Sequence, residues 1–384
     1  MLASHRELFE VPRDVAYLNN GSFTPLPRPV REAGEAGVAA KSQPWRMDPG
    51  AIERRAEAVR EAAARIIGAT ADDIAIVPSA AYGVATAAAN LRVQRGTRIL
   101  LIEGEFPSQS LEWARLAEDR GATLDLVPRP MDGDWTTALL DRIEAPGLSP
   151  VGVAALTPLV WTDGSLIGLE RLAAPLRAQG AAIVVDATQA AGILPLDVGR
   201  LSADYLVFPT YKWLLGPYTL AFLYVAPHRQ AGTPLEQHAA NRLGGAEPFN
   251  GTLGPLIPSA RRFDMGQRFN PISLPMALAG MDLLHGWGRD AIVERLRHTT
   301  DQLAEQAQAC GLQPVARAFR PPHILGLQPP DGITAAALAA SLAAQGVYVA
   351  ERGGRLRVGA HVYNDDQDVA RFGAALQRAL ASGI

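Results

Sequence analysis

The sequence predicts an α/β protein in which a mostly parallel sheet is flanked by helices, followed by a smaller α+β domain at the C-terminal end. Segments typical of strands and of helices alternate through the middle of the chain, which indicates a doubly wound domain. The strand segments are continuous apolar runs, as expected for a parallel sheet covered on both faces. The pattern changes to two long helices after Asn270-Pro271.

The elements follow one another in a regular order. In the first part we expect strands over residues 74–77, 98–102, 123–127, 151–156, 181–185, 205–208 and 220–225, with helices over 81–91, 108–120 and 169–179. Long helices are expected over 273–286 and 289–310. A smaller α+β unit follows, with strands over 324–327, 347–350 and 356–358 and helices over 334–345 and 367–381.

Composition limits the classes of function. The 36 basic and 39 acidic residues give a net charge of -3, so neither nucleic acid nor an anionic membrane is an expected partner. The longest apolar runs are strand-sized, and the charged N-terminal residues do not resemble a signal peptide. Cys310 is the only cysteine, which fits a reducing, cytoplasmic location. The seven histidines are scattered, so no metal site is expected.

An aspartate stands at the end of one predicted strand. Asp186 follows the run 181–185 and precedes Ala187-Thr188-Gln189. Open α/β sheets bind ligands at the carboxyl ends of their strands, so we expect this side chain to point into a cleft. A helix cap or a structural turn is the alternative interpretation of the same residue.

A lysine follows the next predicted strand. Lys212 lies in the segment Thr210-Tyr211-Lys212-Trp213, directly after residues 205–208. Its apolar and aromatic neighbours should desolvate the amine, which lowers its pKa and makes it nucleophilic. A lone lysine is usually a surface residue, but this one is paired with a strand-terminal acid. In pyridoxal-5′-phosphate (PLP) enzymes a lysine binds the cofactor's aldehyde, and an acidic residue keeps the pyridine nitrogen protonated.

Several segments together resemble the class V aminotransferase family of fold-type I PLP-dependent enzymes. That family includes cysteine desulfurases, cysteine C–S lyases, kynureninases and isopenicillin N epimerase-like proteins. The resemblance covers nearly the whole chain. It is carried by Tyr17-Leu18-Asn19-Asn20-Gly21-Ser22, Pro78-Ser79-Ala80-Ala81-Tyr82-Gly83, Glu105-Phe106-Pro107-Ser108, Asp186 with Gln189, Lys212-Trp213-Leu214, Arg262-Phe263-Asp264-Met265-Gly266-Gln267 and Arg355-Leu356-Arg357-Val358.

The resemblance implies PLP as the cofactor and a role for each matching residue. Lys212 would form the Schiff base, Asp186 would pair with the pyridine nitrogen, and Gln189 would donate a hydrogen bond to the phenolic oxygen. Phe106 would stack on the cofactor ring. Arg357, with Asn20, would bind an amino-acid or amine substrate, since a guanidinium suits a carboxylate. Without the resemblance, Arg357 is better interpreted as a strand residue in a surface ion pair.

The resemblance also implies how the cofactor phosphate is held. Ala80 and Ala81 stand where many relatives have threonines, so only backbone N–H groups at a helix N-terminus remain there. Tyr211 replaces the usual histidine, and we expect it to bind the phosphate together with Thr210. Gln267 would complete the site of a neighbouring subunit, which implies a homodimer with shared active sites.

The resemblance further divides the chain. Residues 1–20 would pack on the small domain, residues 21–270 would form the large PLP-binding domain, and residues 271–384 would form linker helices and the small domain.

Two departures bear on the reaction. Phe106 replaces a histidine, and a phenyl ring can stack but cannot transfer a proton. Residues 351–354 stand where persulfide-forming desulfurases carry a cysteine, and they contain none. Cys310 is better interpreted as a small buried helix residue. We therefore do not expect a persulfide-forming cysteine desulfurase.

The expected first step is removal of a proton from the α-carbon, with Lys212 as base and acid. Transamination, β-elimination by a C–S lyase and epimerisation all share that step, and transamination is the favoured reaction. A non-catalytic PLP-fold protein is disfavoured because Asp186, Gln189 and Lys212 are all present. A nicotinamide-dependent enzyme needs a GxGxxG after its first strand, and residues 79–83 do not supply it.

Overall fold

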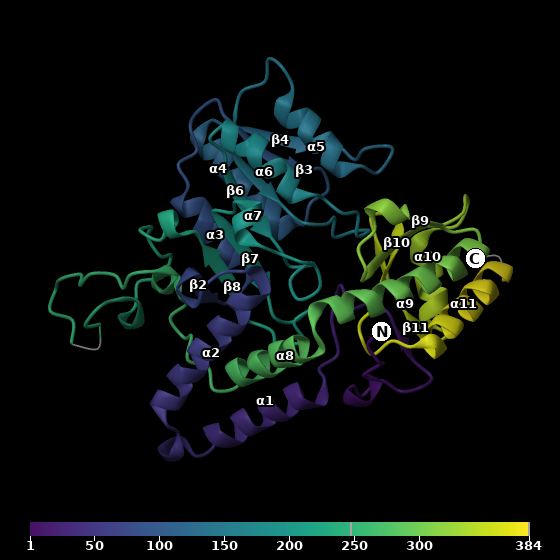
Figure 1. The fold of residues 1–384 in the computed structure, drawn as a ribbon, viewed down its shortest axis with the longest axis horizontal. Helices are drawn as coiled ribbons and strands as arrows, with labels where there is room; N and C mark the ends of the chain where they lie inside the picture. The colour runs from purple at the N-terminus through teal and green to yellow at the C-terminus, as the bar shows by residue number, and fades with distance from the viewer. Residues whose placement is uncertain (246–247, 383–384) are drawn as a thin grey trace.

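A seven-stranded sheet forms the centre of the large domain (Figure 1). The computed structural model describes residues 1–245 and 248–382. The strands lie in the order β2-β8-β7-β6-β5-β3-β4. Their bounds are β2 Ile74–Val77, β3 Arg98–Ile102, β4 Thr123–Val127, β5 Val151–Leu156, β6 Ala182–Asp186, β7 Tyr205–Pro209 and β8 Ala221–Val225. Only β8 runs against its neighbours, so the prediction of a mostly parallel sheet is confirmed.

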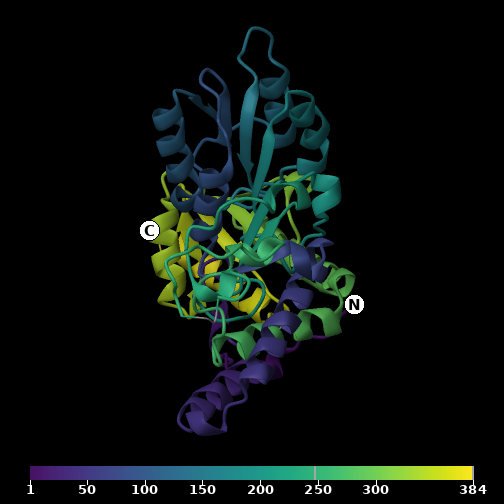
Figure 2. The same cartoon turned by 90° about the vertical axis from the view of Figure 1, so that its left-hand side faces the viewer.

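Helices cover both faces of this sheet, as Figure 2 shows. One face packs on α3 (Ala80–Asn90) and α4 (Pro107–Arg120). The other packs on α2 (Pro49–Ile67), α5 (Trp135–Glu144), α6 (Leu169–Ala178), α7 (Val198–Leu201) and α8 (Ser273–Trp287). Successive residues of a strand point to opposite faces of the sheet. Ile99 packs in the apolar cluster on the face covered by α3 and α4, and Leu100 packs in the cluster on the other face. Two buried faces explain the continuous apolar runs.

The small domain is an antiparallel sheet with helices beside it. Its four strands lie in the order β12-β13-β10-β9, with bounds β9 Gln313–Pro314, β10 Ile324–Gln328, β12 Ala350–Arg352 and β13 Arg355–Gly359. The helices are α9 (Arg289–Ala309), α10 (Ala335–Ala343) and α11 (Asp366–Ala381). The α9 and α8 helices follow one another directly and lead from the large domain to the small one (Figure 1).

The N-terminal segment lies on the small domain. Strand β1 (Ala16–Tyr17) pairs in parallel with β11 (Val347–Tyr348). Arg6 is buried and donates to Asp368 of α11 at 2.7 Å. The first residues of the chain are therefore held by its last helix, and the residues that follow β1 are directed toward the edge of the large sheet.

Four α-helices of the structure were not predicted from the sequence. They are α1 (Arg28–Lys41), α2, α5 and the short α7. Helix α1 lies beside α8 in Figure 1. Two glycines of α1 allow this close approach. A Cβ on Gly34 would lie 2.8 Å from the sulfur of Met276 in α8, and a Cβ on Gly37 would lie 2.5 Å from the carbonyl oxygen of Pro271, just before α8. In the part of the chain that the structure describes, no helix is long and apolar enough to cross a membrane.

Candidate active site

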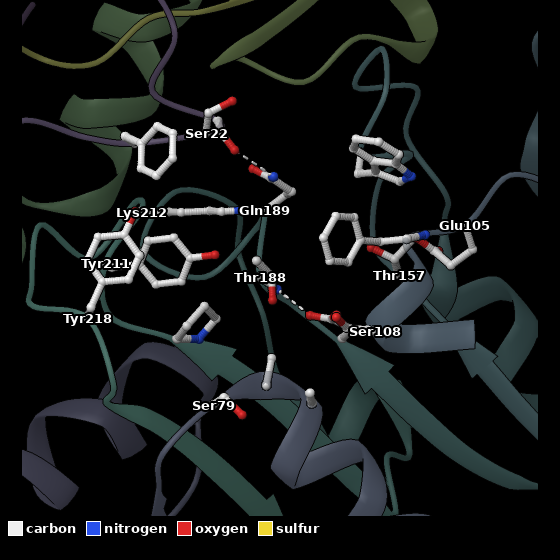
Figure 3. A pocket seen from close by; sticks show the side chains of 18 of the residues that line it. Ser22, Ser79, Glu105, Ser108, Thr157, Thr188, Gln189, Tyr211, Lys212 and Tyr218 are labelled. Carbon is white, nitrogen blue, oxygen red and sulfur yellow. Dashed lines mark hydrogen bonds between the residues drawn. The ribbon is translucent and has the colours of Figure 1, made fainter. Parts of the chain in front are cut away.

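A cavity of about 450 Å³ opens at the carboxyl ends of β6 and β7, where the large domain meets the small one (Figure 3). Eight of the residues singled out in the sequence line it: Ala80, Ala81, Phe106, Asp186, Gln189, Tyr211, Lys212 and Arg357. They come from five separate parts of the chain. A site at the carboxyl edge of a parallel sheet is the usual ligand position in this architecture.

Lys212 extends into the cavity beside Tyr211 and Tyr218 (Figure 3). It follows β7 in a tight loop, in which Leu215 has a φ of 59°. Helix α8 presses on this loop, because a Cβ on Gly280 would lie 2.4 Å from the carbonyl oxygen of Leu214. Left-handed φ is unfavourable for leucine, so packing from α8 must hold the loop in place.

The lysine amine is prepared for nucleophilic attack. Burial and, less strongly, the positive charge of Arg357 together lower the pKa of Lys212 to about 8, and the charge of Asp186 acts in the opposite direction. The amine lies 5.5 Å from the centre of the Tyr211 ring. The chain contains only two lysines, and the other, Lys41, is exposed at the end of α1. Lys212 is therefore the one lysine that can react in this cavity.

Asp186 ends β6 and lines the floor of the cavity. One carboxylate oxygen accepts a hydrogen bond from the backbone N–H of Thr188 at 2.9 Å. Burial raises the pKa of Asp186, and its hydrogen bond and the charge of Lys212 lower it less strongly. A buried carboxylate of this kind is stabilised by a cation beside it. A protonated pyridine nitrogen supplies such a cation, so the residue fits the partner of PLP.

Gln189 connects three parts of the site. Its amide nitrogen donates to the carbonyl oxygen of Gly21 at 3.0 Å, and its amide oxygen accepts from the indole N–H of Trp213 at 2.8 Å. His323 of the small domain contacts the Gln189 carbonyl oxygen at 2.7 Å. A primary amide has a second N–H, which has no acceptor within the described part of the chain, and Gln189 lines the cavity. Gln189 thus holds the N-terminal segment and the lysine loop together.

The N-terminus of α3 forms the end of the cavity where a phosphate fits. Ser79 caps the helix by accepting from the N–H of Tyr82 at 3.1 Å. Ala80 and Ala81 begin the helix and contribute backbone N–H groups without an intrahelical acceptor. Gly83 lets this turn approach the sheet closely: a Cβ there would lie 2.7 Å from Val207 of β7. The first turn of α3 is therefore fixed against the strand that leads to Lys212.

Arg357 reaches the cavity from β13 in the small domain. The side chain is 2% exposed and donates to the Trp161 carbonyl oxygen at 2.8 Å and to the Ser22 hydroxyl at 2.7 Å. Burial and, less strongly, the charge of Arg352 together lower its pKa to about 10. Gly21 makes room for the guanidinium, because a Cβ there would lie 3.1 Å from Cζ. The expectation of a surface ion pair for Arg357 is not met.

Three of the expected site residues lie outside the cavity wall. Asn20 is fully buried and uses its amide to join Gly359 and Tyr363, at 2.8 Å each, which leaves it no path to a substrate. Thr210 is also fully buried and donates to backbone carbonyl oxygens of the lysine loop. Gln267 is exposed on the loop before α8 and does not line this chain's own cavity.

Other lining residues were not assigned a role from the sequence. Among them are Ser22, Phe23, Glu105, Trp161, Tyr218 and Arg352. Tyr218 stacks on Tyr211 with a centroid distance of 4.3 Å, and Trp161 packs edge-on against Phe106 at 5.2 Å. Burial raises the pKa of Glu105 to about 8, so this carboxyl group is mostly protonated at pH 7. The sequence did contain a signal for Glu105: it follows β3 closely and stands next to Phe106, which was assigned to the site.

The family model for class V aminotransferases matches residues 17–373. The chain belongs to this family. It is 27% identical to the uncharacterized aminotransferase YcbU of Bacillus subtilis over 370 residues, covering 95% of this chain and 94% of the relative. It is 28% identical to isopenicillin N epimerase of Streptomyces clavuligerus over 396 residues, covering 94% of each.

The fold is similar to that of a C-DES variant with glycine covalently linked to its PLP cofactor. The TM-score is 0.86 at 21% identity, with 97% of this chain and 98% of the other covered. The cofactor of this family member is PLP, as expected from the sequence. In the described part of the chain, no group of three His, Cys, Asp or Glu side chains could hold a metal ion.

Proposed function

We propose that this PLP-dependent enzyme is an aminotransferase that acts on a small amino acid. The observation that carries the proposal is that one amine, Lys212, lines the cavity with a pKa of about 8, while Phe106, which lines the same cavity, holds no transferable proton. Bound PLP withdraws electrons from the α-carbon of an amino acid attached to it. Transamination then needs one base that moves a proton within a single face of the substrate.

Each residue of the site has a role in this proposal. Lys212 takes the α-proton and returns it, since its amine is neutral in a useful fraction of molecules near pH 8. Asp186 holds the pyridine nitrogen in its protonated form. Gln189 donates its free N–H to the cofactor's phenolic oxygen. Ala80 and Ala81 hold the phosphate through backbone N–H groups.

Substrate binding is assigned to Arg357. Among the residues that the structure describes, its guanidinium has neutral partners only, so a substrate carboxylate would supply the missing countercharge. The aromatic side chains of Phe106, Trp161 and Tyr218 line the cavity and would exclude water from the reacting carbon.

Persulfide chemistry on the protein itself is disfavoured. Cysteine desulfurases belong to the same family and share the fold. Cys310, the chain's single cysteine, caps the C-terminal end of α9 and packs against the small-domain core rather than lining the cavity. Burial raises the pKa of its thiol, which reduces its nucleophilicity. We therefore propose that this chain does not carry a persulfide.

A homodimer is part of the same proposal. The segment before α8 extends away from the large domain (Figure 1) and exposes Phe249 and Leu253, whose exposed fractions are 79% and 76%. Apolar side chains on an extended segment are typical of a subunit contact. Gln267, on the same segment, would then reach the phosphate end of the partner's cavity. Sedimentation analysis of the holoenzyme should give twice the chain mass, and a monomer would contradict the dimer.

The proposed reaction is tested by following the cofactor. Addition of an amino-acid substrate should convert the PLP form to the pyridoxamine form, and a keto acid should reverse the change. The Lys212→Ala variant is the control, because it should bind substrate without either conversion. Release of pyruvate and sulfide without conversion would show β-elimination instead. Loss of optical purity in the amino acid without conversion would show epimerisation.

A further inference from the structure

Two arginines, not one, face the substrate end of the cavity. Arg357 on β13 and Arg352 on β12 both line it. Both donate to the same hydroxyl oxygen, that of Ser22, at 2.7 Å and 3.2 Å. The two donating nitrogen atoms therefore lie no more than about 6 Å apart. Each guanidinium also donates to a backbone carbonyl oxygen, of Trp161 and of Glu351.

In the described residues, 1–245 and 248–382, no carboxylate lies within 4.0 Å of either guanidinium. Arg357 is buried and Arg352 is half-buried. Most of the other buried arginines in this part of the chain do contact a carboxylate. Two like charges at this separation repel each other, and the charge of Arg352 indeed contributes to the lowered pKa of Arg357. Such an arrangement costs free energy unless an anion occupies the space between or beside the two groups.

A substrate with a single carboxylate would leave one positive charge of the cavity without a negative partner. Asp186 is matched by the pyridine nitrogen of PLP, and the phosphate is placed at the N-terminus of α3. Glu105 adds little negative charge at pH 7, since its pKa is about 8. The α-carboxylate of a substrate matches one guanidinium and leaves the other without a partner.

We propose that the substrate carries a second anionic group, which Arg352 binds while Arg357 binds the α-carboxylate. This inference depends on the proposed function only in taking the substrate to be an amino acid. The separation of the two guanidiniums favours a short spacer, so the substrate class is an α-amino acid with a side-chain carboxylate separated from the α-carbon by about one to three methylene groups.

Dicarboxylates without an amino group test the two arginines apart from any reaction. Succinate and glutarate are compared with butyrate and pentanoate, which have the same chain lengths and one carboxylate. Binding to the PLP-loaded enzyme is measured by titration calorimetry. The better of the two dicarboxylates should bind at least about tenfold more tightly than its monocarboxylate, the usual gain from one charge-assisted contact.

Three variants assign that preference to one side chain. Arg352→Gln should bring the ratio of the two affinities close to one. Arg352→Lys should retain most of it, because the charge remains. Arg355→Gln is the matched control: it removes the same charge from the same hairpin, at the residue paired with Arg352, and should leave the ratio unchanged.

Equal binding of dicarboxylates and monocarboxylates by the unmodified enzyme would overturn the inference. An unchanged ratio in Arg352→Gln would overturn it as well. These results differ from a failure of the proposed function. An enzyme that eliminates or epimerises would still prefer the dicarboxylate, whereas one that transaminates alanine but shows no such preference would disprove the second anionic site alone.

Discussion

Removing the charge of Arg357 should make Lys212 harder to deprotonate. The pKa of Lys212 is about 8, and after burial the charge of Arg357 is the largest cause of its lowering. At pH 7 an amine with this pKa is neutral in roughly one molecule in ten, against about one in 2,500 for a lysine at its ordinary value, a gain of ~200-fold. Loss of one nearby cation should raise the pKa of Lys212 by about one unit. Arg357→Gln should therefore lose about tenfold in amine reactivity at pH 7.

Competitive acetylation of the cofactor-free protein measures this pKa directly. Trace acetic anhydride is added over a series of pH values, and the Lys212 peptide is quantified by mass spectrometry. Lys41 provides an internal reference, because it is the only other lysine. Arg355→Gln is the control variant, since Arg355 does not line the cavity. A Lys212 pKa near 10 in the unmodified protein would refute the reasoning. The same Lys212 pKa in the unmodified protein and in Arg357→Gln would refute it as well.

Three further predictions concern the framework around the site. Gly83→Ala should push the first turn of α3 away from β7 and weaken PLP binding several-fold, measured by cofactor titration; unchanged affinity would argue against tight packing there. Asp264→Asn should lower the free energy of unfolding by about 3–5 kcal/mol in denaturant titrations, because it leaves Arg60 without its buried countercharge; a loss below about 1 kcal/mol would contradict this. Burial lowers the pKa of His323 to about 3 and that of His361 to about 4, so the unfolded chain binds protons first as the pH falls below about 6.5. Stability should therefore be full above pH 6.5 and decrease by roughly 3 kcal/mol per histidine by pH 4; replacing both by glutamine should flatten this dependence, and an unaltered slope would count against it.

The strands of the large sheet were predictable because burial on two faces leaves a simple pattern. Residues 98–102 and 151–156 are continuous apolar runs, and their bounds agree with β3 and β5. The direction of β8 was not predictable, since a buried antiparallel strand has the same composition. Helices α1 and α2 were missed because their buried faces consist largely of alanine and glycine, which mark a buried position less clearly than large apolar side chains do. Packing on α8 stabilises both helices.

Site residues were predictable where their position in the sequence, directly after a strand, also fixes their position in the fold. Asp186 and Lys212 each follow a strand directly, so the topology alone brings them to one edge of the sheet. Asn20 and Arg352 show the limit of this reasoning. Whether their side chains face the cavity depends on the register of β13 and on the path of the N-terminal segment over the small domain, and neither is encoded by nearby residues.

The most direct test of the account is reduction of the PLP-loaded enzyme with borohydride, followed by peptide mapping. The chain has only two lysines, so the result is unambiguous. We expect the pyridoxyl label on the peptide that contains Lys212 and none on the peptide that contains Lys41. A label on Lys41, or a protein that takes up no PLP, would contradict the central claim that Lys212 carries the cofactor.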